Sequence, residues 1–181
     1  SNEVSVGELY VVSASGAVDL LDVSNSIDAF AATLTANTSA LTLKNTADLR
    51  IGLLDGVDTK GIKTNEGNVT VNNGSASINL LAGATIDVLD GSSAGAAGFT
   101  ATGDNFTTNA GSNIKTGSGG VTLTGLTGDI TLAAPVTTEN GDIAFSPINF
   151  TSNADATVDT AGGEINFSGT TGSVALGGAV T

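Results

Sequence analysis

The hydrophobic residues of this chain recur in short alternating runs, and from residue 114 onward the runs belong to units of constant length. Each unit opens on an aliphatic residue, which is followed by Thr two positions later, Gly five positions later and apolar residues seven and nine positions later. Apolar residues two apart lie on the same side of an extended strand. The units therefore predict short strands with one apolar face. Their first residues, spaced 22 apart, are Ile114, Val136, Val158 and Val180.

The same pattern continues towards the N-terminus with less regular spacings of 23, 28, 24 and 28 residues. Each unit offers three strand-like pieces, and in the unit from Val136 the third piece is assigned to Ile148 and Phe150, a few positions out of phase. The weakest unit is the one in which "DGSSAGAAG" interrupts the pattern. The earlier unit starts are Val11, Leu34, Ile62 and Ile86.

Glycine occupies one phase of the repeat. A Gly-rich segment of low complexity would not keep step with the aliphatic residues in this way. The position predicts a corner between two strands at which the backbone adopts a positive φ, which glycine adopts most readily. The column is Gly16, Ser39, Gly67, Gly91, Gly119, Gly141 and Gly163.

Short strands joined by tight corners, in units of 22 to 28 residues, are typical of one rung of a parallel β-solenoid. We expect an all-β fold, a right-handed parallel β-helix of about seven rungs, because parallel connections favour that hand. Residues 1–181 form a single segment of it, and the chain is expected to be part of a longer repeat shaft. A β-sandwich is the alternative, but it requires hairpin turns and gives no reason for a constant repeat.

Composition narrows the function. A net charge of −13 disfavours nucleic acid as a partner, because phosphate binding needs clustered Lys and Arg. No apolar run is long enough to span a bilayer, so membrane insertion is not expected. No signal peptide is visible at the first residues. The absence of Cys excludes disulfides and thiol chemistry, which is compatible with a bacterial surface protein and with a cytosolic one.

Candidate catalytic residues are few. The chain lacks His and Cys, which removes the usual nucleophile triads and zinc ligands. Asp142 and Glu164 each stand six residues into their unit, so they are expected on adjacent rungs. Two such carboxylates repel one another unless they are solvated, protonated or bridged by a cation. We interpret them as solvated corner acids and expect no enzyme, with a carbohydrate-active β-helix as the alternative.

Two acidic, Gly-bearing segments belong to the 28-residue units, and insertions of this kind usually project as loops from one face of a solenoid. Their carboxylates are of the type that binds calcium, although neither an EF-hand spacing nor a calcium-binding nonapeptide array is present. No cofactor is expected, and calcium is the open alternative. The candidate calcium ligands are Asp55, Asp58, Asp87, Asp90 and Asp104.

A column of threonines two residues after the unit starts raises the question of an outward array that binds ice. The column before it carries charge, so a flat, repeated Thr-x-Thr surface is not expected there. The threonines are Thr64, Thr116, Thr138 and Thr160. The preceding column is Lys63, Lys115, Thr137 and Asp159.

The stretch "NIKTGSGGVTLTGLTGDITLAAPVTTENGDIAF" resembles the repeats of filamentous-haemagglutinin-like exoproteins. The resemblance lies in the phrase I-x-T-x-x-G-G/D-I/V-x-L/F followed by G-D-I-T-L, and it is clearest between Ile114 and Thr181. It implies a right-handed β-helix in the extracellular shaft of a bacterial surface or secreted adhesin, with roles in adhesion or biofilm. The "N-P-N-G"-type secretion motif of that family is absent from the sequence.

On this basis the chain is expected to act as a rigid spacer or fibre at the bacterial cell surface or outside the cell. Its expected partners are neighbouring copies or further repeats of the same protein, together with glycans or other cell surfaces that lateral loops would contact.

Overall fold

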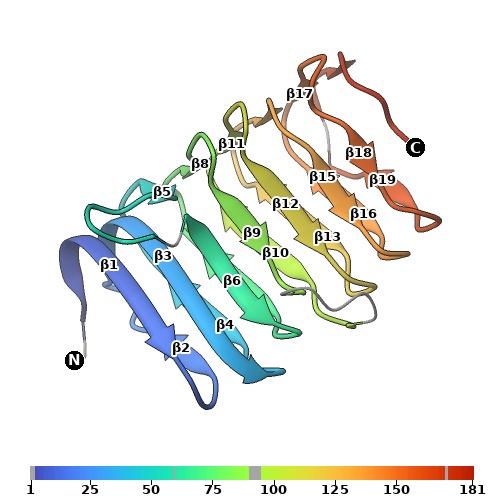
Figure 1. Ribbon diagram of the computed structural model, residues 1–181. Coiled ribbons are helices and arrows are strands. Elements are labelled where there is room, and N and C mark those ends of the chain that lie inside the picture. The colour runs from blue at the N-terminus through green and yellow to red at the C-terminus, as the bar shows by residue number, and fades with distance from the viewer. Residues whose placement is uncertain (1–2, 59, 90–94, 170) are drawn as a thin grey trace.

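The computed structural model describes residues 3–58, 60–89, 95–169 and 171–181, and in this part of the chain it contains strands but no helix. Figure 1 shows the strands stacked one behind another along a single axis from the N-terminus to the C-terminus. Every pairing between strands is parallel, and the strands that pair come from successive units of the sequence. The fold is a parallel β-helix, as predicted, while its right-handed sense stays a prediction.

The strands form three faces. The first face contains β6 (Gly61–Asn65), β9 (Thr85–Asp87), β12 (Asn113–Thr116), β15 (Val136–Thr138) and β18 (Val158–Asp159). The second face contains β2 (Val18–Leu20), β4 (Leu41–Lys44), β7 (Val69–Asn72), β10 (Phe99–Gly103), β13 (Val121–Gly125), β16 (Ile143–Ser146) and β19 (Ile165–Phe167). The third face contains β5 (Leu49–Ile51), β8 (Ile78–Leu80), β11 (Phe106–Thr108), β14 (Ile130–Leu132), β17 (Phe150–Ser152) and β20 (Val174–Leu176). The long strand β3 (Ser26–Asn37) pairs with β5, with β6 and with β1 (Ser5–Ser13), and so joins the first and third faces into one sheet.

The register confirms most of the predicted unit starts. Ile114 pairs with Ile86 on one side and with Val136 on the other, and Val136 pairs with Val158. Val158 also forms a parallel bridge to Val180. Identical positions of successive units therefore lie on top of one another, at the interstrand spacing of about 4.8 Å.

The predicted start at Leu34 is wrong by two residues. Ala32 is the residue that pairs with Val11 and with Ile62, whereas Leu34 pairs with Thr64. The two extra residues are absorbed by a register shift between Leu34 and Asn37. A displacement of two leaves the same side chains facing inward, because strand side chains alternate with a period of two. The hydrophobic pattern therefore could not reveal it.

The third piece of the unit from Val136 also needs correction. Phe150 pairs with Ile130, and Ser152 pairs with Leu132, so the inward pair is Phe150 and Ser152 rather than Ile148 and Phe150. Ile148 precedes β17 and is only half-buried.

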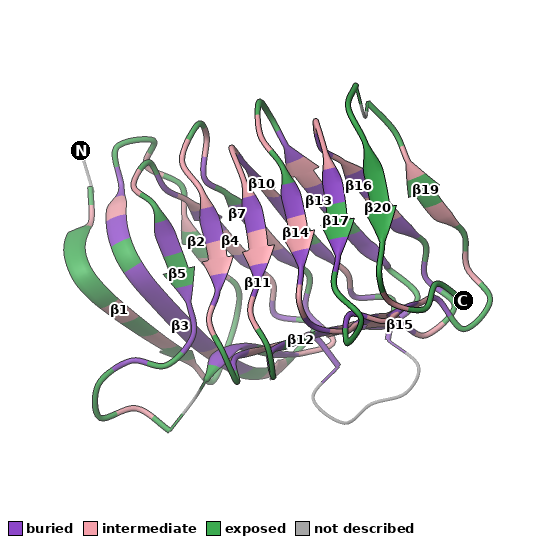
Figure 2. Cartoon of the chain, turned by 90° about the horizontal axis from the view of Figure 1, so that it is seen from above, coloured by how far each residue is buried: buried purple, intermediate pink, exposed green. Residues whose placement is uncertain are grey.

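The inward side chains of the three faces fill a single continuous core. Figure 2 colours buried positions purple on the successive strands of each face. Towards the C-terminus the core becomes aromatic. The ring centroid of Phe145 lies 4.7 Å from that of Phe150 and 5.3 Å from that of Phe167. The equivalent inward residues of β20, Val174 and Leu176, are 43% and 50% exposed, since no rung of the described chain covers them.

The glycine column fulfils a different requirement from the one predicted. Gly16 has a φ of +81°, but Gly67, Gly119, Gly141 and Gly163 lie outside the positive-φ region, and Gly91 falls outside the described residues. A Cβ atom at Gly67 would stand 1.8 Å from the carbonyl oxygen of Ser39 on the preceding rung. The position therefore requires glycine because the backbones of adjacent rungs meet there. The positive φ falls one residue earlier, at Thr38, Glu66, Asn140 and Gly162, and beside Gly119 it falls one residue later, at Gly120.

The threonine column points inward. All four of its side chains are buried, with exposed fractions of 4% or less. The Thr64 hydroxyl donates a hydrogen bond of 2.6 Å to the carbonyl oxygen of Gly67, and the Thr138 hydroxyl donates to the carbonyl oxygen of Gly141. The threonine and glycine columns therefore form one corner, in which the hydroxyl supplies a partner to a buried carbonyl group.

The first of the two predicted insertion loops folds back on the coil instead of projecting from it. Leu54 is 3% exposed and packs against Ala29 and Ala31, which lie on the outward side of β3. The backbone N–H of Asp55 donates a hydrogen bond of 3.3 Å to the carboxylate of Glu8 on β1. This lateral segment, described at residues 52–58 and 60, is closed at its base by an antiparallel bridge between Leu53 and Lys60. Residues 90–94 of the second insertion lie outside the described chain.

Candidate functional site

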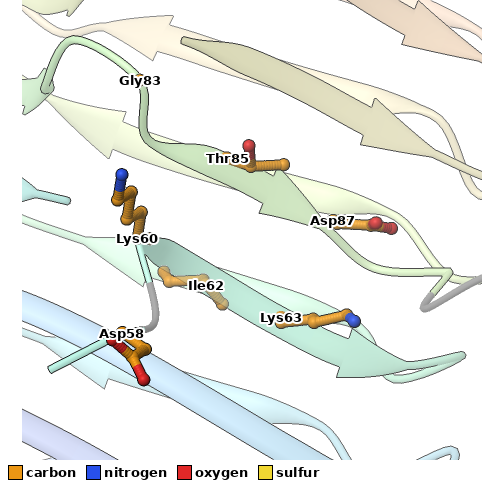
Figure 3. A pocket seen from close by; sticks show the side chains of 8 residues that line it. Asp58, Lys60, Ile62, Lys63, Gly83, Thr85 and Asp87 are labelled. Carbon is orange, nitrogen blue, oxygen red and sulfur yellow. The ribbon is translucent and has the colours of Figure 1, made fainter. Parts of the chain in front are cut away.

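A shallow pocket of about 330 Å³ lies on the outer side of the first face, where the lateral segment joins β6. Its walls come from the end of the lateral segment, from β6 and from the turn and strand of β9. Figure 3 shows Lys63 and Asp87 extending in a similar direction from neighbouring strands, while Asp58 points away from β9. The lining residues with polar side chains are Asp58, Lys60, Lys63, Thr85 and Asp87.

The register between β6 and β9 explains why Lys63 and Asp87 lie side by side in this pocket. In the parallel pair of β6 and β9, Gly61 is opposite Thr85 and Lys63 is opposite Asp87. A Cβ atom at Gly61 would stand 2.1 Å from the carbonyl oxygen of Thr85, so only glycine permits this approach. Lys63 and Asp87 are both outward residues at the same level of the strands. The register therefore places opposite charges side by side on adjacent rungs.

The charges of the pocket alternate along the stack. Asp87 lies between Lys63 on one rung and Lys115 on the next. Only five residues of the chain are Lys or Arg, and two of them line this pocket. Opposite charges that face one another on adjacent strands contribute about 0.2–1 kcal/mol each, so their effect on stability is small. With both donors and acceptors around a partly apolar floor, the pocket has the chemistry to bind a small polar ligand.

The calcium hypothesis gains no support from the described residues. Asp58 and Asp87 do line the same pocket, but Lys60 and Lys63 line it as well, and ammonium groups repel a cation. One oxygen of Asp87 accepts a hydrogen bond of 3.0 Å from the backbone N–H of Leu89. Across the described chain, no three acidic side chains gather closely enough to hold a metal ion.

The other calcium candidates lie apart from this pocket. Asp55 is exposed in the lateral segment, at the contact with β1. Both carboxylate oxygens of Asp104 accept hydrogen bonds from side chains of the β-helix itself, one from Asn105 and one from Thr127. Asp90 lies outside the described residues.

Asp142 and Glu164 lie on adjacent rungs, as predicted. Ile143 pairs with Ile165 directly after them, and one carboxylate oxygen of Asp142 accepts a hydrogen bond of 2.8 Å from the backbone N–H of Glu164. Both side chains are exposed. The Asp142 side chain thus links one rung to the next, which is a structural use of the carboxylate.

The same linkage recurs before the strands of the third face, where sequence analysis missed it. Side-chain oxygens of Asn105, Asp129 and Asn149 each accept a hydrogen bond, of 2.9, 3.1 and 2.9 Å, from a backbone N–H one rung further on. Asp48 does the same for Ser77 at 2.9 Å. The available signal was an Asp or Asn directly before the first apolar residue of the third strand-like piece.

A second polar ladder is buried. Asn45 is 3% exposed, and its side chain bonds to both the N–H and the C=O of Ile27, at 2.7 and 3.1 Å. Its amide group also donates to the side-chain oxygen of Asn73 at 2.9 Å. The third member, Asn25, is 1% exposed and accepts a hydrogen bond from the N–H of Val4. In the first rungs these asparagine side chains therefore provide hydrogen-bond partners for backbone groups at the corners, such as those of Val4 and Ile27.

Comparison with known proteins finds no match: no protein family, no curated protein and no solved structure resembles the sequence at a significant level. The described residues also contain no helix of the length and hydrophobicity that a membrane-spanning helix needs.

Proposed function

We propose that this chain is a rigid structural segment, a spacer or fibre element of a bacterial surface or secreted protein of the adhesin type. The observation that carries the proposal is the register. From β6 to β18 each rung stacks on the next with equivalent residues opposite one another, so the coil can be lengthened by whole rungs. A spacer needs this property, whereas an enzyme does not.

The polar side chains support the same proposal. Where a polysaccharide-cleaving β-helix would hold its carboxylates ready for substrate, Asp129 and Asp142 accept backbone hydrogen bonds from the next rung. They thereby strengthen the stack along its axis. The resemblance of residues 114–181 to filamentous-haemagglutinin-like repeats points to the same role, with further repeats or neighbouring copies as partners.

A rung-insertion experiment tests the spacer. Three extra copies of residues 136–157 are inserted after residue 157, so that every junction repeats the native pairing of Val136 with Val158. We expect a folded protein, with unchanged circular dichroism per residue, whose longest dimension in small-angle X-ray scattering grows by about 14 Å. A control inserts the same residues in scrambled order. If the native and scrambled insertions perturb the fold equally, the coil is not modular and the proposal is wrong.

The pocket on the first face favours a second candidate, a contact site for a neutral or weakly charged saccharide. Lys60 and Thr85 supply donors there, and Asp58 supplies acceptors. Screening on a glycan array would test it, with Lys60→Ala as the perturbing variant and Lys44→Ala, on the second face, as the matched control. Binding that is lost only in Lys60→Ala supports the site, whereas binding that survives in both variants contradicts it.

A further inference from the structure

The outer surface of the second face carries a two-dimensional array of small hydroxyl side chains. Thr70, Thr100 and Thr122 are in register on β7, β10 and β13. Two residues further along the same strands, Thr102 and Thr124 are also in register, with Asn72 beside them on β7. The Thr-x-Thr pattern that the first face lacks on its outer surface is therefore repeated in register on β10 and β13 of the second face.

The array is free of charge. The chain has 18 acidic residues, yet the outward positions of β7, β10, β13 and β16 hold neither an acidic nor a basic side chain. Ala144 and Ser146 continue the two columns on β16. Charged residues flank these positions: Asp104 follows β10 directly, Lys44 on β4 is opposite Asn72, and Asp142 and Glu164 stand at the corner that precedes the last two strands. Charge is thus confined to the border of the surface.

The spacing of the array is fixed by the backbone. Neighbouring strands lie about 4.8 Å apart, and outward residues on one strand are about 6.6 Å apart. Threonine is β-branched, so its χ1 is restricted and the hydroxyl and methyl groups repeat with the lattice. The hydrogen-bonded ladders beneath hold the strands in place. The result is a stiff grid of hydroxyl groups, each able to donate and accept a hydrogen bond, separated by methyl groups.

Such a grid matches a ligand that is itself periodic, flat and uncharged. A soluble saccharide is a poorer match, because sugar sites usually include an aromatic ring or a carboxylate. Here five of the six phenylalanines, Phe30, Phe99, Phe106, Phe145 and Phe150, are fully buried, and the sixth, Phe167, is half-buried and packs against the core. The two spacings of the grid approach those between water oxygens on a prism face of hexagonal ice. We propose that the outer surface of the second face binds ice, by ordering water on Thr70, Thr100, Thr102, Thr122 and Thr124.

Ice adsorption of the intact chain tests the proposal, independently of the spacer role. The protein is allowed to partition into a slowly growing ice hemisphere, and its thermal hysteresis is measured in a nanolitre osmometer. We expect the wild-type chain to enter the ice and to separate the freezing and melting points. Thr100→Lys and Thr122→Lys should abolish both effects, because a long charged side chain breaks the grid.

The matched control is Thr131→Lys. Thr131 is an outward threonine in register with Thr107 and Thr151, but it stands on the third face beside the charged and amide ladder. It should keep full ice adsorption, and circular dichroism should show all variants folded. The proposal is overturned if wild type is excluded from ice like serum albumin, or if Thr131→Lys loses as much as Thr122→Lys. Adsorption to cellulose or chitin without adsorption to ice would likewise overturn it in favour of a polysaccharide.

Discussion

Replacing Gly67 with alanine tests whether the glycine column is required by contact between rungs or by backbone conformation. The φ of Gly67 lies outside the left-handed region, so conformation alone would make the change neutral, or stabilising by about 0.4–1 kcal/mol. The new Cβ, however, would stand 1.8 Å from the carbonyl oxygen and 2.5 Å from the carbonyl carbon of Ser39. Both are backbone atoms of a paired rung and cannot rotate away. Overpacking in a core typically costs about 1–3 kcal/mol, and we expect a loss of about 3 kcal/mol.

The matched control is Gly74→Ala. Gly74 has a φ of +54°, and no atom lies within 4 Å of the place that a Cβ would take, so its replacement introduces a left-handed alanine but no clash. Its expected loss is about 1 kcal/mol. With a urea m-value of about 2 kcal/mol/M, the unfolding midpoint should fall by about 1.5 M in Gly67→Ala and by about 0.5 M in Gly74→Ala. Midpoints that fall equally, or a larger fall in Gly74→Ala, would refute the contact explanation.

Three further predictions concern the polar ladders and the net charge. Thr138→Val removes the hydroxyl that donates to Gly141 and should lower the free energy of unfolding by about 1–3 kcal/mol in urea titrations, while Thr138→Ser should lose less; equal losses would show that the hydroxyl is not the cause. Asn45→Ala removes the side chain that hydrogen-bonds to the N–H of Ile27 and to the side chain of Asn73. Hydrogen exchange at the Ile27 amide should therefore accelerate; an unchanged exchange rate would show that Asn45 does not protect this amide. With a net charge of −13, raising the salt concentration from about 0.01 to 0.15 M should raise the melting temperature by screening repulsion; a melting temperature that stays constant or falls would contradict this.

The strand pattern was predictable because each inward aliphatic residue stacks on its equivalent one rung away. Ile114 and Val136 therefore carry the register in the sequence itself. The start at Leu34 was not predictable, because a shift of two residues preserves the inward face, and only pairing with Ile62 distinguishes Ala32 from Leu34. The alternation predicts that Thr64 faces inward together with Ile62. It does not predict the hydrogen-bond partner of the Thr64 hydroxyl, which is the carbonyl oxygen of Gly67 at the corner.

The candidate sites were less predictable than the fold. Sequence spacing brought Asp142 and Glu164 together, since both belong to units of constant length. It could not place Asp58 and Asp87 around the same pocket, because the length and path of the lateral segment decide which of its residues line that pocket. The hydroxyl array of the second face was missed for another reason. Its threonines alternate with core residues such as Leu123, so in the sequence they form the polar half of an ordinary strand, and only the register aligns them into an array.

Distances between spin labels can test the claim that the chain forms a stiff coil of rungs in register. The chain contains no Cys, so paired cysteine substitutions give unique labelling sites. Along the third face, Arg50 and Thr151 are four rungs apart and Arg50 and Ala175 five, through successive register partners. We predict narrow distance distributions by double electron–electron resonance for Arg50→Cys/Thr151→Cys and Arg50→Cys/Ala175→Cys, with means near 19 and 24 Å before the label linkers are included, and hence about 5 Å apart. Broad distributions, or means that do not increase by one rung spacing, would contradict the claim.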